Sequence, residues 1–347
     1  MKEFGIPFAM AISYLNQHMK IQPTQKQMTS GRSFLAMKST KSLWVVLTLF
    51  SALQFSCTDS DLDTVVEIQE EFSDITSIEV DAEFLDVSYV GTSGQSQVSL
   101  SANVRSNSKR RNEVKYLVEG NKLKIEVNSK GGIRSLKSEG SIILTGPRNI
   151  SLDLESGSGT IEVSNVTGQK TDLEAGSGKI IAKNINSSEI ELEVASGSIL
   201  AEDLTGKVSV EVASGKMEIN RVDGNVTAQG ASGQMKITAV NGTVKAGISS
   251  GNIEMSEIRS LGRVELSSGK LFATSTGLSA ETSLKASSGT MYIQTPSNLS
   301  LFNFNITTGS GSARVGESVS SGTLNINNGS SFTIRGEVNS GKIEIVN

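Results

Sequence analysis

The stretch that decides the fold is residues 190–237, where one twelve-residue pattern occurs three times. Residues 190–201 read IELEVASGSILA, residues 208–219 read VSVEVASGKMEI, and residues 226–237 read VTAQGASGQMKI. The central Ser-Gly pair recurs along the chain at steps of 18 to 20 residues, and further pairs lack this spacing. The regularly spaced glycines are Gly159, Gly178, Gly197, Gly215, Gly233, Gly251, Gly269 and Gly289; the others are Gly311, Gly322 and Gly341. A repeat of this length predicts an architecture in which each copy stacks on the next.

Alternate positions after each glycine are apolar, which is typical of a strand with one buried face. The second position holds Ile161, Ile180, Ile199, Met217, Met235, Ile253, Leu271 and Met291. The fourth position holds Val163, Ala182, Ala201, Ile219, Ile237, Met255, Ala273 and Ile293, whereas the third varies freely. A similar alternation precedes the glycine, and turn formers such as Asn165, Asn184 and Asp203 follow. Each copy is therefore predicted to form two or three short strands separated by tight corners.

A single copy cannot bury its own apolar face, so neighbouring copies must stack to make one core. We therefore expect an all-β fold, a single-stranded β-helix or β-solenoid with coils of 18–19 residues. At about 3.3 Å per residue and about 4.8 Å per coil, the perimeter is roughly 60 Å and about ten coils make a rod roughly 50 Å long. The corner glycine is expected to serve the turn, because no helix follows it to bind a phosphate.

Residues 1–56 are expected to be a leader for export, with Met37 as the expected true start. A basic segment and the apolar run of residues 43–53 form a secretory signal that is too short to span a bilayer comfortably. Cys57 comes immediately after Ser56, and the segment of residues 53–57 resembles a loose lipobox, in which the cysteine becomes the lipidated first residue of a bacterial lipoprotein. We therefore expect a lipid anchor at Cys57.

The remainder of the chain divides into a tether and one domain. Residues 57–71 are expected to be an acidic tether, which resembles a surface-export signal of some Bacteroidetes lipoproteins or is a plain solvated linker. Residues 72–347 are expected to form the β-solenoid, with repeats over residues 147–347. Residues 72–146 are less regular, and they either continue the rod, which we favour, or form a cap.

Composition excludes several function classes. The net charge of −4 arises from 32 basic and 36 acidic residues spread evenly, so we expect no nucleic-acid partner. The only histidine, tryptophan and cysteine are His18, Trp44 and Cys57. A mature domain without histidine or thiol has no Ser-His pair, cysteine nucleophile or zinc ligand set, so we predict no catalytic residue, metal or cofactor.

One candidate ligand face is a column of carboxylates four residues before the corner glycine. Its members are Glu155, Glu174, Glu193, Glu211 and Glu265, with Gln229 interrupting. The strand alternation places them outside, where Lys179, Lys216 and Lys270 are available to offset their charge. We interpret the column as a solvated ladder; binding of Ca²⁺ and an acid and base pair are the alternatives.

The second candidate face consists of aromatic residues near the C-terminus, Phe272, Tyr292, Phe302 and Phe304. Exposed rings on a regular β face can stack against sugars, whereas rings in terminal coils often seal the core. Both interpretations stay open, and sealing is the favoured one for this group as a whole.

Three motifs carry a resemblance to a known family. They are F-x-x-I-x-x-I-x-V over residues 72–80, GNKLKI over residues 120–125, and the serial Ser-Gly-x-Ile-x-Val units. Together they resemble the auto-transporter adhesin head GIN domain family of Bacteroidetes adhesins, over roughly residues 70–347. The resemblance implies a β-helix-like domain on exported, often lipid-anchored proteins, with adhesion as the suggested role and no catalytic residues to carry over.

These observations lead to one expected function and two alternatives. We expect a non-catalytic, adhesin-like lipoprotein of the cell envelope, anchored in the outer membrane by lipid, that binds a protein or a glycan at the cell surface. One alternative is a carbohydrate-active β-helix enzyme. The other is an envelope-stress or scaffold protein that faces the periplasm.

Overall fold

The computed structural model describes residues 62–107, 112–129 and 137–347. All described residues belong to one compact unit, Ser60–Asn347. The predicted leader, the predicted anchor Cys57 and residues 57–61 of the predicted tether lie outside the described residues.

The described residues form fifteen β-strands and one short 3-10 helix, so the predicted all-β class is confirmed. The strands are β1 (Asp63–Phe72), β2 (Ser77–Asp81), β3 (Asp86–Thr92), β4 (Val98–Ser106), β5 (Asn112–Glu119), β6 (Lys122–Ser129), β7 (Ser138–Pro147), β8 (Ser151–Ser156), β9 (Thr160–Ala175), β10 (Lys179–Asp223), β11 (Val226–Gln294), β12 (Asn303–Val315), β13 (Ser318–Ser320), β14 (Thr323–Ile326) and β15 (Thr333–Val346). The helix η1 spans Leu299–Leu301. Over these ranges no helix reaches the length and apolar character that crossing a bilayer requires.

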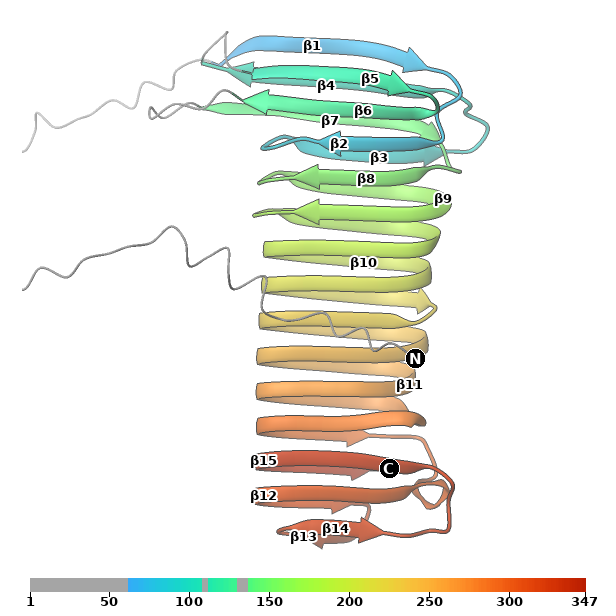
Figure 1. Ribbon diagram of the computed structural model, residues 1–347, viewed down its shortest axis with the longest axis vertical. Coiled ribbons are helices and arrows are strands. Elements are labelled where there is room, and N and C mark those ends of the chain that lie inside the picture. Colours follow the sequence, from blue (N-terminus) through green and yellow to red (C-terminus); the bar gives the residue numbers. More distant parts are fainter. Residues whose placement is uncertain (1–61, 108–111, 130–136) are drawn as a thin grey trace, which may run out of the picture. The chain divides into compact units, whose positions relative to one another are not determined.

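Strands β9, β10 and β11 are the continuous windings of a β-solenoid, as Figure 1 shows. Strand β10 pairs in parallel with β9, with Ile180 opposite Ile161. It pairs in parallel with β11, with Met217 opposite Met235. The predicted coil of 18–19 residues is therefore confirmed for these windings.

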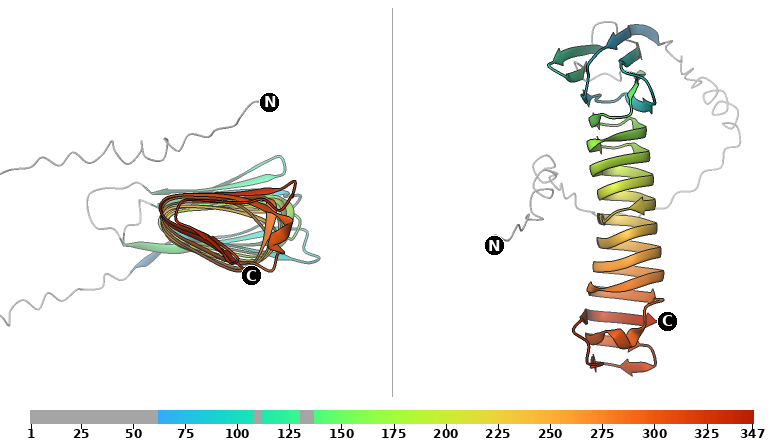
Figure 2. Two further views of the ribbon diagram at one scale, coloured as in Figure 1. Left: turned by 90° about the horizontal axis from the view of Figure 1, so that it is seen from below. Right: turned by 90° about the vertical axis from the view of Figure 1, so that its right-hand side faces the viewer.

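Each winding folds into two long walls, which give the flattened oval cross-section seen in Figure 2. The segment before each Ser-Gly corner lies in the glutamate wall, named for Glu155, Glu174 and Glu193. The five residues after the corner lie in the opposite wall, which we call the aromatic wall for Phe272 and Tyr292. The two walls are the opposite long sides of the winding seen end-on in Figure 2, so the two candidate faces lie on opposite sides of the rod.

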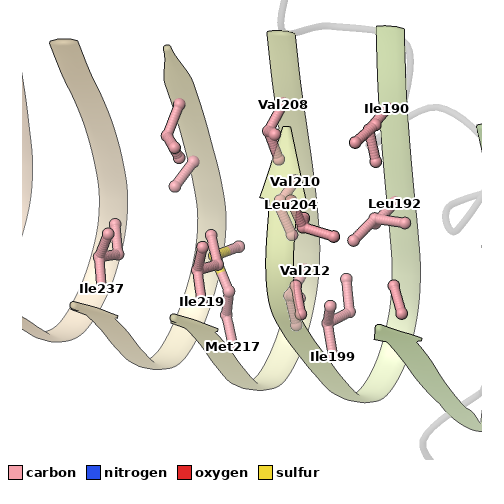
Figure 3. Close-up of a cluster of buried hydrophobic side chains, with 14 of the residues drawn as sticks. Ile190, Leu192, Ile199, Leu204, Val208, Val210, Val212, Met217, Ile219 and Ile237 are labelled. Carbon is pink, nitrogen blue, oxygen red and sulfur yellow. The ribbon is translucent and has the colours of Figure 1, made fainter. Parts of the chain in front are cut away.

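The core fills the narrow space between the walls. Leu192 and Val210 of the glutamate wall and Met217 of the aromatic wall are each at most 1% exposed and lie inside the windings, as Figure 3 shows. Because the repeat places apolar residues at the equivalent position of each winding, these side chains form continuous apolar columns along the rod. Burial of each such side chain stabilises the fold by about 1.5–3 kcal/mol.

The Ser-Gly corner requires glycine for a steric reason. Gly233 stacks on Gly215 with a φ of 128°, and a Cβ at Gly233 would lie 1.9 Å from the Gly215 carbonyl oxygen. Neighbouring backbones approach so closely at this corner that no side chain fits. The predicted structural role of the recurring glycine is therefore confirmed.

The opposite corner is built from non-glycine residues in the left-handed region. The positions with φ between 49° and 61° are Asn165, Asn184, Asp203, Arg221, Ala239, Glu257 and Ser275. The first three are turn formers that the sequence indicated, and the last four are residue types for which this conformation costs about 1–2 kcal/mol. The windings on either side hold the corner in this shape.

At the N-terminal end, strands from different parts of the sequence alternate along the rod. Strands β2 and β3 form a winding that pairs in parallel with β8 and β9 on one side and with β6 and β7 on the other. Beyond this point the pairing is antiparallel: β4 pairs with β7, and β5 pairs with β6. Strand β1 in turn pairs with β4, and these three strands cover the end of the rod. The less regular region thus contributes both coils and a cap.

Strand β1 contains residues 63–71, which the sequence predicted to be part of the tether. The side chains of Val66, Ile68 and Phe72 are partly buried against the core. This contact explains why the ordered fold begins earlier than the acidic composition suggested.

The C-terminal end is also out of sequence order. Strand β15 pairs in parallel with both β11 and β12, so the last segment of the chain lies between them, and β13 and β14 cover β12. Gly341 therefore stacks on Gly289, and Gly311 stacks on Gly341. The glycines that had lost the regular spacing rejoin the corner column, except Gly322, which has no atom within 4 Å of its Cβ position.

Candidate binding site

The glutamate wall carries a straight column of carboxylates on its outer face. Glu174 lies opposite Glu155 and Glu193 in the adjoining windings, and all three are exposed, as the strand alternation predicted. The column continues at the N-terminal end, where Asp81 lies opposite Glu155 and Glu126 lies opposite Asp81. The sequence repeat did not indicate these two residues, because β2 and β6 lie outside the regular spacing.

Glu211 extends this column by one winding, whereas Glu265 does not belong to the same uninterrupted run. Gln229 lies opposite Glu211, and Gly247 stacks on Gln229, so two windings without a carboxylate intervene. Glu265 is half-buried and forms an ion pair with Arg263. The five predicted carboxylates therefore form a group of four and one separate residue.

The group of four is electrostatically uncompensated. No ion pair within the described residues includes Glu155, Glu174, Glu193 or Glu211. Burial, and secondly the neighbouring carboxylates, raise the pKa of Glu155 and of Glu193. Both effects disfavour the charged form, so the column opposes folding when it is fully ionised.

The expectation that Lys179, Lys216 and Lys270 offset this charge is not met. They stand one residue past the corner and therefore lie on the aromatic wall. Lys216 pairs with Glu218 on that wall at 2.9 Å, and no ion pair between described residues involves Lys179 or Lys270. The corner turns the chain away from the glutamate column, which the linear sequence could not show.

A neighbouring column on the glutamate wall is compensated instead. Lys170 Nζ lies 2.8 Å from carboxylate oxygens of both Asp172 and Glu191, and Lys207 Nζ lies 2.8 Å from Glu189. These pairs raise the pKa of Lys170 and lower that of Glu189. The wall therefore has one balanced column beside one that is purely acidic.

A straight column does not gather its carboxylates around one point. Over residues 62–107, 112–129 and 137–347, no group of three or more potential ligands converges in a way that could hold a metal ion. Ca²⁺ takes six to eight oxygen ligands. The geometry of the described column therefore gives the calcium alternative no support.

Replacing Glu155 and Glu193 by glutamine together should stabilise the protein at pH 7. The pKa of each of these carboxyls is higher in the folded protein than in the unfolded chain, where it is about 4.3. The free energy of unfolding therefore decreases as the pH rises from the unfolded-state pKa through the folded-state pKa. Glu155 and Glu193 are the two like-charged neighbours of Glu174, and removing their charges from the exposed sheet should raise the free energy of unfolding by about 1 kcal/mol in total. Thermal melts followed by circular dichroism should show this gain at pH 7 and its disappearance near pH 4.

Glu189→Gln is the matched control, because its carboxylate is ion-paired and its pKa is lowered. Its effect should have the opposite sign, a slight loss at pH 7 that fades on acidification. Equal melting temperatures of the double variant and the parent at pH 7 would show that the column carries no repulsion.

The aromatic wall carries an exposed pair of stacked rings. Phe272 and Tyr292 occupy the same position in consecutive windings, three residues past the corner glycine. Their ring centroids lie 5.3 Å apart with an interplanar angle of 12°. Phe272 is 53% exposed, and Tyr292 is half-buried and adds a phenolic hydroxyl. This pair is an apolar surface within a wall that is otherwise mostly polar outside.

Phe302 and Phe304, predicted in the same group, are core residues. Phe302 is 8% exposed and Phe304 is 2% exposed, and their rings pack edge to face. Strand β14 pairs with β12 over Phe304, and this cap accounts for their burial. The sealing interpretation is confirmed for these two residues and wrong for Phe272.

A small recess lies on the aromatic wall next to the ring pair. It has a volume of about 180 Å³, and its lining is mixed: Lys216, Gln234, Lys236, Asn252 and Glu254 are polar, and Met217 and Met235 are apolar. These residues come from three successive windings, and the winding that carries Asn252 and Glu254 directly precedes the one that carries Phe272. The recess and the rings are therefore adjacent.

Some of the charges on this wall are paired, whereas Lys179 and Lys270 are in no ion pair between described residues. Glu218 lies 2.9 Å from Lys216 and 3.9 Å from Lys236. On the far side of the rings, Glu344 lies opposite Tyr292 and is held by Arg314 at 3.1 Å. The rings thus lie between the recess and the ion pair of Arg314 with Glu344, and the unpaired Lys270 lies two residues before Phe272.

The sequence comparison decides the family. A family model described as Toastrack DUF4097 matches residues 75–256 and 224–346, which extend from just before β2 to the end of β15. The chain belongs to the Toastrack DUF4097 family. The matched model is not that of the auto-transporter adhesin head GIN domain, so that finer resemblance stays a prediction for this Toastrack chain.

None of the curated proteins matches the Toastrack chain. Solved structures that match include a candidate adhesin of Bacteroides fragilis, 13% identical over 81% of this chain and 97% of that one, with a TM-score of 0.37. A candidate lipid-binding protein of Parabacteroides distasonis is 14% identical over 83% and 98%, with a TM-score of 0.38. The family assignment rests on the Toastrack match and not on these structures.

Proposed function

We propose that this chain is a non-catalytic, lipid-anchored protein of the cell envelope whose solenoid presents its aromatic wall to a protein or a glycan at the cell surface. The observation that supports this most directly is the exposed stack of Phe272 on Tyr292. Single exposed apolar residues are ordinary on protein surfaces, but a pair of rings beside a recess that includes polar side chains combines apolar contact with hydrogen-bonding groups, as ligand sites do.

The architecture suits presentation of a surface. Parallel windings held in register by their backbones and by continuous apolar columns make stiff walls on which outward residues keep fixed spacings. The predicted anchor Cys57 lies six residues before β1 begins at Asp63, so a short segment joins it to the folded domain. Binding groups on such a wall need no conformational change to act together.

The anchor is tested by Cys57→Ala in the producing bacterium. The parent protein should sediment with membranes and enter the detergent phase, whereas the variant should be found in the soluble fraction, because it lacks the sulfur to which lipid attaches. Ser60→Ala in the same segment is the matched control and should behave as the parent. A Cys57→Ala variant that still partitions with membranes would remove the lipoprotein part of the proposal.

Orientation is tested by protease treatment of intact cells. A protein at the cell surface should be removed from intact cells, and a periplasmic marker should survive. Removal only after the outer membrane is permeabilised would favour the periplasm-facing scaffold instead.

A carbohydrate-active enzyme is the second candidate, and one observation favours it. Glu174 and Glu193 lie opposite each other in adjoining strands, and the two catalytic residues of retaining glycosidases are likewise a pair of carboxylates close to each other. Both face solvent on an open wall without partners that would orient a substrate. We expect no turnover of a polysaccharide panel by the parent; hydrolysis that Glu174→Gln abolishes would establish the enzyme instead.

A further inference from the structure

We infer that two copies of this chain associate head to head through their N-terminal ends, where β1 of each copy pairs with β5 of the other. The inference goes beyond the proposed function, because it concerns the end of the rod and not the ring pair. It rests on the open edges of two long strands, on exposed apolar side chains and on the way in which the two walls end.

The N-terminal end of the rod presents two long strands that each have an open edge. Over residues 62–107, 112–129 and 137–347, β1 pairs only with β4, and β5 pairs only with β6. These two strands have ten and eight residues. The edge strands at the C-terminal end, β13 and β14, have three and four. Very short edge strands discourage pairing with another chain, so the N-terminal end is the one that can accept a further strand.

Three consecutive apolar residues of β5 are exposed at this edge. Tyr116 is 39% exposed, Leu117 is 56% exposed and Val118 is 41% exposed. Because side chains alternate between the two faces of a strand, the exposure of three in succession means that β5 is uncovered on both faces. The end unit of a solenoid usually presents a polar outer face to water. Strand β5 therefore lacks the cover that an added strand would supply.

The two walls end one strand apart, as Figure 1 shows. Beyond the winding of β2 and β3, the glutamate wall continues with β6 and β5. The aromatic wall continues with β7, β4 and β1, which is one strand more. Among the described residues, β1 therefore has no strand opposite it on the glutamate wall. A second copy whose walls are exchanged has the complementary stagger.

A twofold rotation about an axis parallel to the strands pairs both edges at once. It turns the second copy head to head and exchanges its walls, so β1 of each copy continues the wall that ends in β5 of the other. Strand β1 runs in the direction of β7, and β5 runs against β6. Because the chain reverses its direction between the two walls, β1 and β5 run the same way, and the rotation keeps this direction. Each pairing is therefore parallel, as it is between the windings.

A contact between β1 and β5 within one copy sets the register of this pairing. The rings of Phe72 and Tyr116 lie edge to face at a centroid distance of 5.6 Å, and the Tyr116 hydroxyl donates to Glu70 at 3.0 Å. Phe72 and Tyr116 therefore lie at the same level along the strands, and the rotation preserves this level. Phe72 then comes beside Tyr116 of the second copy, and Glu71 comes beside Lys115 of the second copy on the outer face.

Glu71 and Lys115 carry complementary charges. Glu71 is exposed and belongs to no ion pair between described residues. Lys115 Nζ lies 3.3 Å from a carboxylate oxygen of Glu113 on its own strand. Lys170 is held by two carboxylates, one on its own strand and one on the adjoining strand. Lys115 can hold Glu113 and Glu71 of the second copy in the same way.

The position of the predicted lipid anchor is compatible with this association. Cys57 precedes β1 by six residues, so both anchors would lie near the junction of the two copies. The two rods would extend from the junction in opposite directions. The ring pair of Phe272 and Tyr292 lies in β11, away from the junction, and stays free in both copies.

The test is light scattering of the full chain in detergent, with the mass of the bound detergent subtracted, over a range of protein concentrations. We expect the parent to be a dimer. Glu71→Lys and Lys115→Glu should each weaken dimerisation by roughly tenfold or more, because the twofold axis turns each change into two repulsive contacts. The double variant that carries both changes should recover most of the parental affinity, because it exchanges the two charges.

Lys285→Glu is the control for these charge reversals. The Lys285 side chain is 57% exposed, that of Lys115 is 58% exposed, and each has a carboxylate partner, but Lys285 lies in β11. This variant should dimerise as the parent does. All variants keep Cys57, so any sharing of a detergent micelle is the same in each. All change exposed side chains and should keep the parental melting temperature.

The inference is overturned if the parent is a monomer at all concentrations, if neither single reversal weakens the dimer, or if the double variant stays as weak as the single ones. Amide hydrogen exchange measures the strand pairing itself. Residues 112–119 should exchange more slowly in the parent dimer than in the Lys115→Glu variant, and equal rates would exclude β5 as the contact. A dimer that Phe272→Ala dissociates would place the contact on the aromatic wall instead.

Discussion

Gly233→Ala should destabilise the solenoid by about 3 kcal/mol or more. The new Cβ would lie 1.9 Å from the Gly215 carbonyl oxygen, and the φ of 128° is a conformation that alanine rarely adopts. Relief requires the two windings to separate at the corner, which breaks backbone hydrogen bonds on both sides of it. The loss should be measurable as a lower unfolding midpoint in denaturant, with faster amide hydrogen exchange centred on residues 208–240.

Gly322→Ala is the matched control for this substitution. Gly322 also follows a serine, but no atom lies within 4 Å of its Cβ position, so the change should stay within about 0.5 kcal/mol. If Gly233→Ala were as well tolerated as Gly322→Ala, the close approach of neighbouring windings at the corner would be wrong.

Ile343→Asp should undock the C-terminal end of the rod. Ile343 is fully buried in β15 between Met291 of β11 and Ala313 of β12. An unpaired carboxylate there should cost at least about 4 kcal/mol, more than a terminal strand gains from its remaining contacts. Because the solenoid is stabilised by contacts between neighbouring windings, the damage should stay local.

Limited proteolysis and hydrogen exchange can check this expectation. Residues 295–347 should become cleavable and exchange rapidly, while β9 and β10 keep their protection, and the bared edge of β11 should promote aggregation. Asn339→Asp adds the same charge on the same strand at an exposed position and should leave the cap intact. Uniform loss of protection along the whole rod would contradict the local docking of β15.

The two candidate faces show which features of a surface site can be predicted from a sequence repeat and which cannot. Strand alternation correctly placed Glu155, Glu174 and Phe272 outside, because parity along a strand is a local property. It could not reveal that Asp81 and Glu126 extend the column or that Lys179 lies on the other wall. These relations depend on which strands lie side by side and on where the chain turns.

The sequence by itself determined the windings of this protein. A step of 18 to 19 residues repeats the same inward and outward pattern, so stacking in register is the arrangement that buries each apolar column and places glycine above glycine. Only the tertiary structure decided the ends. There β2 and β3 and, at the other end, β15 insert between segments distant in sequence, because an open winding accepts whichever strand completes its core and backbone pairing, and no local period encodes that choice. The same long-range choice buried Phe304 under the cap formed by β14.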